Sequence, residues 1–269
     1  MPNLPDFFAN HPVFTTEEVA RFHRAQHSGK PGTLRVLLMR HHARGRLIAV
    51  RRGVYATVPA GHTADKLPVD AYQVASRLAP DAVLGYHTAL ELHGLAHSVF
   101  SRLQFLTHSA ARACTFRDVA FEPVRVPKAL SGQRDGSIGV TRVQRMGLDI
   151  RITTIERTCV DSLDRPDLCG GWEEVMHSVD AVEQLDVESL IQYTLKLHSA
   201  TIAAKVGWFL EINAGRLGVT AHQLDRLRAH RPKSRQYVDR EYPYGHRAAR
   251  GWNLLLPMEL AERRWREVG

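Results

Sequence analysis

The sequence of 269 residues contains only three cysteines, and their spacing matches neither a disulfide framework nor a zinc site. An odd number of unpaired thiols, Cys114, Cys159 and Cys169, fits a reducing compartment. No run of 18 apolar residues is present, so no transmembrane helix is predicted. The first residues lack the charged and apolar regions of a signal peptide. We therefore expect a cytoplasmic protein without membrane contact, metal or cofactor.

The sequence also lacks the motifs of the common enzyme classes. None of its six lysines follows an acidic residue by two positions, as the usual restriction-nuclease motif requires. No phosphate-binding glycine loop with a lysine and no Ser/His/Asp set is visible. Gly136-Ser137 could begin a nucleotidyltransferase motif, in which two acids spaced Asp-x-Asp hold two metal ions. Asp149 could be the first of these acids, but the second position is occupied by Arg151. We expect no catalytic residues. The alternative is a divergent nuclease or nucleotidyltransferase domain, fused to the N-terminal domain described below, whose activity depends on Asp149 or Asp161.

Three histidines and one charged pair are open to more than one interpretation. His93 and His97 are spaced as metal ligands on a helix would be, but Gly94 is expected to end that helix and no third ligand is evident. We interpret His87 and His93 as structural histidines with hydrogen bonds. Arg157 and Asp161 are four residues apart, which predicts an ion pair on the surface of a helix or partly buried.

Positive charge is concentrated at the two ends of the chain. Residues 1–60 carry nine Lys and Arg against three Asp and Glu, a net charge of +6. Residues 61–215 carry 15 against 19, which gives −4, and residues 216–269 carry 12 against six, which gives +6. The whole chain is thus at +8 with a pI of about 9.7. Nucleic-acid contact is expected at the ends rather than in the acidic middle.

The stretch 15–59 has the pattern of a helix, a turn, a second helix and a two-stranded wing. Thr15 and Glu18 form the signature of a capping box at the first helix. The second helix is predicted from about Thr33 to Arg44, where Gly45 ends it. Its inward face is predicted to carry Leu34, Leu37, Leu38 and His41, and its outward face Arg35, Val36, Met39, Arg40 and Ala43. Strands are predicted at 46–50 and 54–58, joined by a turn at 51–53.

This pattern, together with its charge, predicts a winged helix that binds double-stranded DNA. Arg35, Met39 and Arg40 can face base edges. Arg44, Arg46, Arg51 and Arg52 can meet phosphates. The full set of candidate DNA-binding residues is Lys30, Thr33, Arg35, Met39, Arg40, Arg44, Arg46, Arg51 and Arg52.

The remaining residues predict an α+β fold with one small sheet and a helical C-terminal portion. A lead helix at 3–10 is expected to pack on the winged helix. A linker at 59–68 separates a DNA-binding domain, residues 1–60, from an α+β domain, residues 69–269, with a further boundary near 185. Helix starts are predicted at Thr154, Asp186, Ser199 and Thr220, and strands at 83–85, 103–107, 119–126, 138–145, 149–153 and 252–257.

Four segments, in this order, resemble the antitoxins of bacterial AbiE abortive-infection systems, which are type IV toxin–antitoxin systems. They are Arg51-Arg52-Gly53-Val54-Tyr55, the run from Tyr86 to Leu95, the run from Ile155 to Asp161, and the run from Gly251 to Pro257. The resemblance covers nearly the whole chain. It implies a transcriptional repressor that binds the promoter of its own toxin–antitoxin operon through the winged helix. It further implies that the C-terminal part counteracts a nucleotidyltransferase-type toxin, with or without direct contact. A stand-alone relative with no neighbouring toxin is also open.

Overall fold

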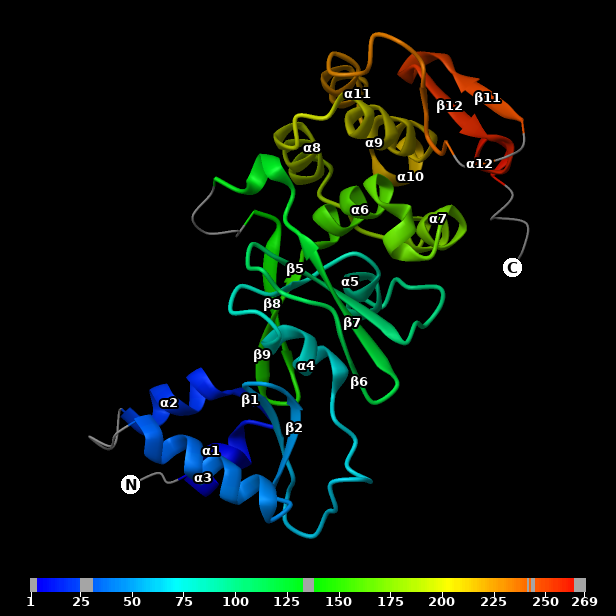
Figure 1. Cartoon of the computed structure of the whole chain (residues 1–269). Coiled ribbons are helices and arrows are strands. Elements are labelled where there is room, and N and C mark those ends of the chain that lie inside the picture. Colours follow the sequence, from blue (N-terminus) through cyan, green and yellow to red (C-terminus); the bar gives the residue numbers. More distant parts are fainter. Residues whose placement is uncertain (1–3, 25–30, 133–137, 241, 243–244, 264–269) are drawn as a thin grey trace. The chain divides into compact units, whose positions relative to one another are not determined.

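The computed structural model describes residues 4–24, 31–132, 138–240, 242 and 245–263 (Figure 1). The chain is an α+β protein whose described residues form three separate sheets, and it divides into two compact units. The first unit contains residues 1–84, 101–124 and 142–151, and the second contains residues 85–100, 125–141 and 152–269. Among the described residues, no helix has both the length and the apolar character needed to cross a bilayer.

The first unit begins with three helices and a three-stranded sheet (blue in Figure 1). The elements are α1 (Leu4–Asn10), β1 (Val13–Thr15), α2 (Thr16–Arg24), α3 (Pro31–Ala43), β2 (Leu47–Arg51) and β3 (Val54–Thr57). β3 lies between β1 and β2 and runs antiparallel to both. The predicted capping box is present, because the Thr15 amide donates to Glu18 at 2.7 Å and the Glu18 amide donates to Thr15 Oγ1 at 3.1 Å. The short strand β1 was not predicted from the sequence.

The first unit also holds most of a six-stranded sheet, in the order β6-β7-β5-β4-β9-β8. Its strands are β4 (Val83–Leu84), β5 (Arg102–Thr107), β6 (Cys114–Phe116), β7 (Val119–Arg125), β8 (Val140–Arg145) and β9 (Leu148–Thr153). Helix α4 (Ala71–Arg77) packs against β5. With six strands, this sheet is larger than the small sheet that the sequence predicts. Strand β4 joins its two parts, because it pairs with both β5 and β9, although 64 residues lie between the starts of β4 and β9.

The second unit is mainly helical and ends in a third sheet. Its helices are α5 (His87–Leu92), α6 (Ile155–Asp164), α7 (Trp172–Asp180), α8 (Val187–Lys196), α9 (Ala200–Ile212), α10 (Ala214–Leu217), α11 (Ala221–Arg228) and α12 (Met258–Glu262). Short 3₁₀ turns span Lys128–Leu130, Pro166–Cys169 and Arg250–Trp252. The sheet has the order β10-β12-β11, with β10 (Gln236–Tyr237), β11 (His246–Ala249) and β12 (Leu254–Pro257).

All four predicted helix starts are confirmed by side-chain caps. Thr154, Asp186, Ser199 and Thr220 each accept a hydrogen bond from the backbone amide three residues later. Such caps satisfy one of the free amides of a first helical turn without any help from tertiary structure. This local origin explains why the sequence alone located them.

The predicted linker, residues 59–68, lies inside the first compact unit. Leu67 in that segment is buried, and the Arg117 guanidinium donates to the carbonyl oxygens of Leu67 and Ala64. Arg77 of α4 pairs with Glu18 of α2 at 3.0 Å. Residues 1–60 therefore share contacts with α4 and are grouped with it in one compact unit.

Candidate nucleic-acid interface

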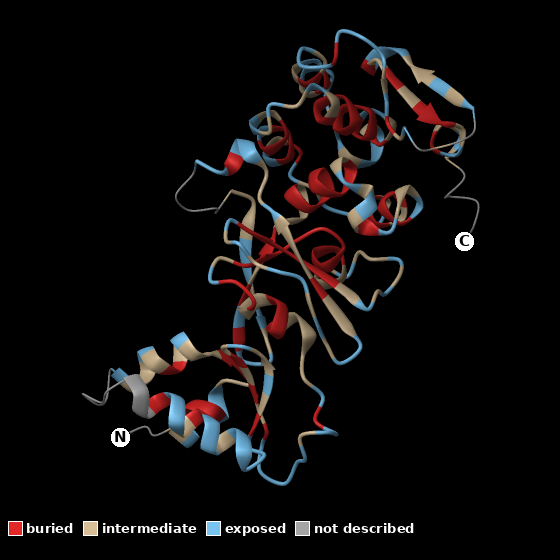
Figure 2. Cartoon of the chain, viewed as in Figure 1, coloured by how far each residue is buried: buried red, intermediate tan, exposed pale blue. Residues whose placement is uncertain are grey.

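Helix α3 has one face inside the protein and one face in solvent, as the sequence predicts. Leu34 and Leu38 are buried, and Leu37 and His41 are half-buried. On the other side Arg35, Val36, Met39, Arg40 and Ala43 are all exposed, with 47% of Val36 and 59% of Met39 open to solvent. Figure 2 shows buried and exposed residues alternating along this helix.

An aromatic cluster holds α3 in this orientation. Leu34 and Leu38 pack with Phe7, Phe8 and Phe14 of the preceding elements. The rings of Phe7 and Phe14 meet edge to face, 5.3 Å apart. Val36 and Met39 thus remain exposed on the outer face of α3, whereas the apolar contacts of the helix with this cluster come from its inner face.

His41 lies at the edge of the cluster and is expected to stay neutral. Its ring meets that of Phe8 at 5.0 Å. Burial lowers the pKa of His41, and the positive charges of Arg46 and Arg44 lower it further. His41 therefore adds no positive charge to this region near neutral pH.

The turn between β2 and β3 is fixed against the start of α2. The Thr16 amide donates to the Gly53 carbonyl oxygen at 2.8 Å. Gly53 has a backbone φ of 85°, which residues other than glycine rarely adopt. A Cβ atom at this position would lie 3.4 Å from Thr16 Oγ1. Arg52 at the turn is exposed and Arg51 is half-buried. The basic turn is consequently anchored to the start of α2 by a backbone hydrogen bond.

The structure brings most of the predicted DNA-binding residues to the surface without acidic partners. Arg35, Arg40, Arg44, Arg46 and Arg52 are exposed. Among the described residues, no carboxylate oxygen lies within 4.0 Å of the guanidinium of any of these five arginines, and the same holds for Arg51. Lys30 lies outside the described residues, and the side chain of Thr33, at the start of α3, lies outside them too. Unpaired arginines are available to bind an external anion.

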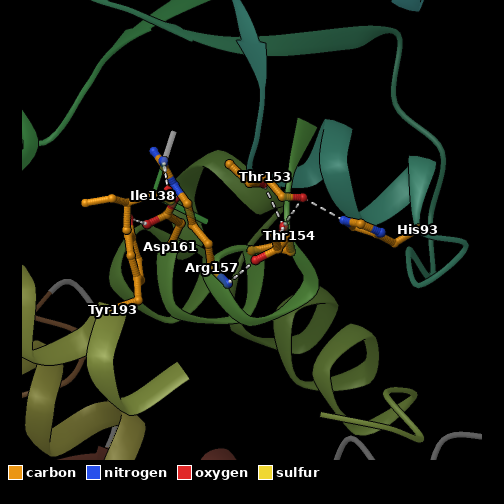
Figure 3. A network of polar contacts seen from close by, with 8 residues as sticks. His93, Ile138, Thr153, Thr154, Arg157, Asp161 and Tyr193 are labelled. Carbon is orange, nitrogen blue, oxygen red and sulfur yellow. Dashed lines mark hydrogen bonds and ion pairs between the residues drawn. The ribbon is translucent and has the colours of Figure 1, made fainter. Parts of the chain in front are cut away.

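The remaining landmarks of the sequence form a polar network in the second unit (Figure 3). Arg157 Nε donates to Asp161 at 3.1 Å, and both side chains are only 3% exposed. Arg157 also donates to the Ile138 carbonyl oxygen at 2.8 Å, and the Tyr193 hydroxyl donates to Asp161 at 2.6 Å. Burial raises the pKa of the Asp161 carboxyl, while Arg157 and Tyr193 oppose that shift. The pair is therefore a buried one, not one on a helix surface.

The three histidines singled out in the sequence also have partners within this unit. His93 Nε2 lies 2.7 Å from the Thr153 carbonyl oxygen. His87 is fully buried between Glu91 and Glu174, at 3.4 and 3.3 Å. The ring of His97 stacks on that of His177 at 4.3 Å. His87 and His93 are structural, as interpreted, and within the described part of the chain no three His, Cys, Asp or Glu gather as metal ligands would.

The two acids named by the enzyme alternative have different surroundings. Asp149 is exposed on β9 in the first unit, whereas Asp161 is buried and paired in the second. Gly136-Ser137 lies outside the described residues. Each Asp161 carboxylate oxygen accepts one hydrogen bond, one from Arg157 and the other from Tyr193.

Comparisons with known proteins give a similarity of fold. No family model and no curated protein matches the chain. The crystal structure of the RV2827C protein from Mycobacterium tuberculosis is similar, with a TM-score of 0.54 and 15% sequence identity. The match covers 94% of this chain and 88% of that one. At this identity the likeness concerns the architecture, which is shared over nearly the whole length of both chains.

Proposed function

We propose that the protein is a DNA-binding transcriptional repressor that inserts the outer face of α3 into the major groove. The observation that carries this proposal is that face itself, on which Arg35, Val36, Met39 and Arg40 are exposed. Neither arginine has a carboxylate partner in the part of the chain that the structure describes. A surface helix usually carries polar residues on its outer face, so the exposed Val36 and Met39 between the two arginines depart from the usual pattern.

The side chains on α3 have the chemistry needed to read bases. Arginine can form two hydrogen bonds with guanine, and apolar groups contact the methyl group of thymine. Arg44, Arg46 and Arg52 lie beside the helix in sequence and carry charges suited to phosphates. The order α1-β1-α2-α3-β2-β3, with a hairpin after the last helix, supports the assignment of a winged helix.

The resemblance to AbiE antitoxins extends the proposal to the biological setting. On that basis the operator is the promoter of the protein's own operon, and the second unit counteracts a nucleotidyltransferase-type toxin. Co-expression with the product of the adjacent gene tests this part. We expect the full-length chain to restore growth that the neighbouring gene product arrests, and growth arrest that persists would limit the proposal to transcriptional control.

Base reading and phosphate contact are expected to respond differently to mutation. Arg35→Ala with Arg40→Ala should cost about 1–3 kcal/mol for each base pair read, and only on the native promoter. Arg51→Gln with Arg52→Gln should weaken binding to every duplex and flatten its salt dependence. Fluorescence anisotropy with promoter and shuffled duplexes of equal length measures both effects.

Two results would contradict this proposal. Equal losses on promoter and shuffled DNA for the α3 variant would show that this helix does not read bases. Unchanged promoter binding in the Arg51 and Arg52 variant would remove the wing from the interface. Far-UV circular dichroism of each variant controls for loss of the fold, since the four side chains make no ion pair within the described chain.

A further inference from the structure

A cavity of about 570 Å³ lies in the first unit, beside the turn between β2 and β3. Four stretches of chain line it: the first turns of α2, the β2–β3 turn, the end of α4 with the residues after it, and strands β8 and β9. All of the lining residues belong to this one unit. The cavity therefore joins the proposed wing to a part of the chain that lies 80 or more residues later in the sequence.

The lining is strongly basic. It contains the side chains of Arg21, Arg51, Arg52, Arg77, Arg142 and Arg151, against Glu17, Glu18 and Asp149. Glu18 is already occupied, since it accepts from the Thr15 amide and pairs with Arg77. Five arginines then face two acids, a net charge of +3, and none of the five has a carboxylate within 4.0 Å in the part of the chain that is described.

Arg151 of β9 faces the cavity because side chains alternate along that strand. In β9, Leu148, Ile150 and Ile152 are buried, whereas Asp149 is exposed and Arg151 is half-exposed. Successive side chains of a strand point to opposite faces, so the buried residues fix the outward direction of Arg151. Arg142 of β8 is exposed as well. Two cations outside residues 1–60 are thereby presented next to the basic turn.

We propose that this cavity is a second phosphate-binding surface, in which the sugar-phosphate backbone of the bound duplex contacts Arg142 and Arg151. The proposal rests on the proposed function, and it extends the DNA interface from the winged helix onto the six-stranded sheet. Arg51 and Arg52 belong to both surfaces, so one backbone can pass continuously from the wing into the cavity.

The composition of the cavity favours a nucleic-acid backbone over a small ligand. Small-molecule sites are mostly apolar, with a few converging polar groups. Here the cations come from four separate stretches, and those of Arg21, Arg52 and Arg142 are exposed. Spread-out, hydrated cations suit a chain of phosphates, which binds through charge and counterion release rather than through a tight fit.

The test uses the full-length chain with Arg142→Gln and Arg151→Gln combined. Losing two phosphate contacts should lower the slope of log K against log salt by about 1.8 for both promoter and shuffled duplexes. At about 0.1 M salt the affinity should fall between roughly tenfold and sixtyfold, because each contact releases about 0.9 counterion. Arg142→Lys with Arg151→Lys keeps both charges and should retain most of the slope. Arg112→Gln, an exposed arginine of the same unit outside the cavity, is the matched control and should change nothing.

The outcomes separate this inference from the proposed function. Wild-type affinity and slope in the double glutamine variant would overturn the cavity proposal and leave the α3 interface standing. Failure of the unmodified protein to bind either duplex would overturn both. Titration calorimetry with inorganic tripolyphosphate tests the other source of phosphate. Binding that the double variant abolishes, together with unchanged duplex binding, would make the cavity a site for a small anion instead.

Discussion

Replacing Trp252 with alanine is expected to destabilise the second unit by about 3–5 kcal/mol, the usual cost of removing a large buried aromatic side chain. Trp252 is 0% exposed. Its indole nitrogen donates to Glu211 of α9 at 2.8 Å, and the Arg228 guanidinium of α11 lies over the ring at 5.2 Å. The side chain thus fastens the segment before β12 to two helices, and its loss removes both a packing contact and a polar one.

The partner of this ring is a glycine in the middle of α9. A Cβ built on Gly207 would lie 2.1 Å from the six-membered ring of Trp252, far inside any real contact. Gly207→Ala gains about 1 kcal/mol of helix propensity, yet we expect a net loss of about 1–3 kcal/mol or more from overpacking. The ring cannot simply move aside, because its hydrogen bond to Glu211 fixes it in place.

Urea unfolding followed by tryptophan fluorescence measures both changes, since all four tryptophans come after residue 151. Gly215→Ala in α10 is the matched control, because a Cβ there meets no atom within 4 Å. It should be neutral or slightly stabilising. Trp252→Phe, with a smaller ring, should recover part of the loss caused by Gly207→Ala. Equal unfolding midpoints for Gly207→Ala and Gly215→Ala would contradict the close packing described above.

Asp161→Ala is expected to cost about 3–5 kcal/mol of stability, because it leaves the buried Arg157 guanidinium without its counter-charge. The Tyr193 hydroxyl would lose its acceptor at the same time. Removing both charges, with Arg157→Met and Asp161→Leu, should cost much less than the sum of the single changes. The same fluorescence-detected unfolding gives the coupling free energy.

An exposed ion pair from the same region provides the control for that cycle. Arg165 and Asp167 are joined by hydrogen bonds of 2.9 and 2.8 Å, but both side chains are exposed to solvent. Asp167→Ala should therefore cost no more than about 1 kcal/mol. If Asp161→Ala were as mild as Asp167→Ala, water would have to reach Arg157, and the pair would not be buried as the structure has it.

Local patterns were sufficient for much of the candidate interface. The spacing of Leu34, Leu37 and Leu38 predicted which face of α3 turns inward, and Gly45, with φ of 69°, ends the helix as expected. Strand β2 is displaced by one residue from the predicted 46–50 and ends at Arg51, whereas β3 begins at Val54 as predicted and ends one residue earlier, at Thr57. Hydrophobic periodicity and backbone preference act within a few residues, so they can be seen without a structure.

Contacts between distant segments could not be anticipated in this way. No local signal shows that Arg157 is buried, because the spacing of Arg157 and Asp161 is the same on a helix surface as in a core. The six-stranded sheet is another case, since a strand was predicted at 83–85 but its place between β5 and β9 was not. Such pairings depend on side chains far away in the chain.

The sequence by itself determined the helix starts, the inward and outward faces of α3, and the concentration of positive charge in the first sixty residues. Helix starts and helix faces depend on residues close together in the sequence, and the net charge is obtained by counting charged residues. Only the tertiary structure decided that those sixty residues share a compact unit with α4 and the large sheet, that Trp252 closes over Gly207, and that Arg142 and Arg151 join the turn at Arg52 around one cavity. The physical reason is that packing and strand pairing select partners by shape and register across the whole chain, and neither is encoded at any single position.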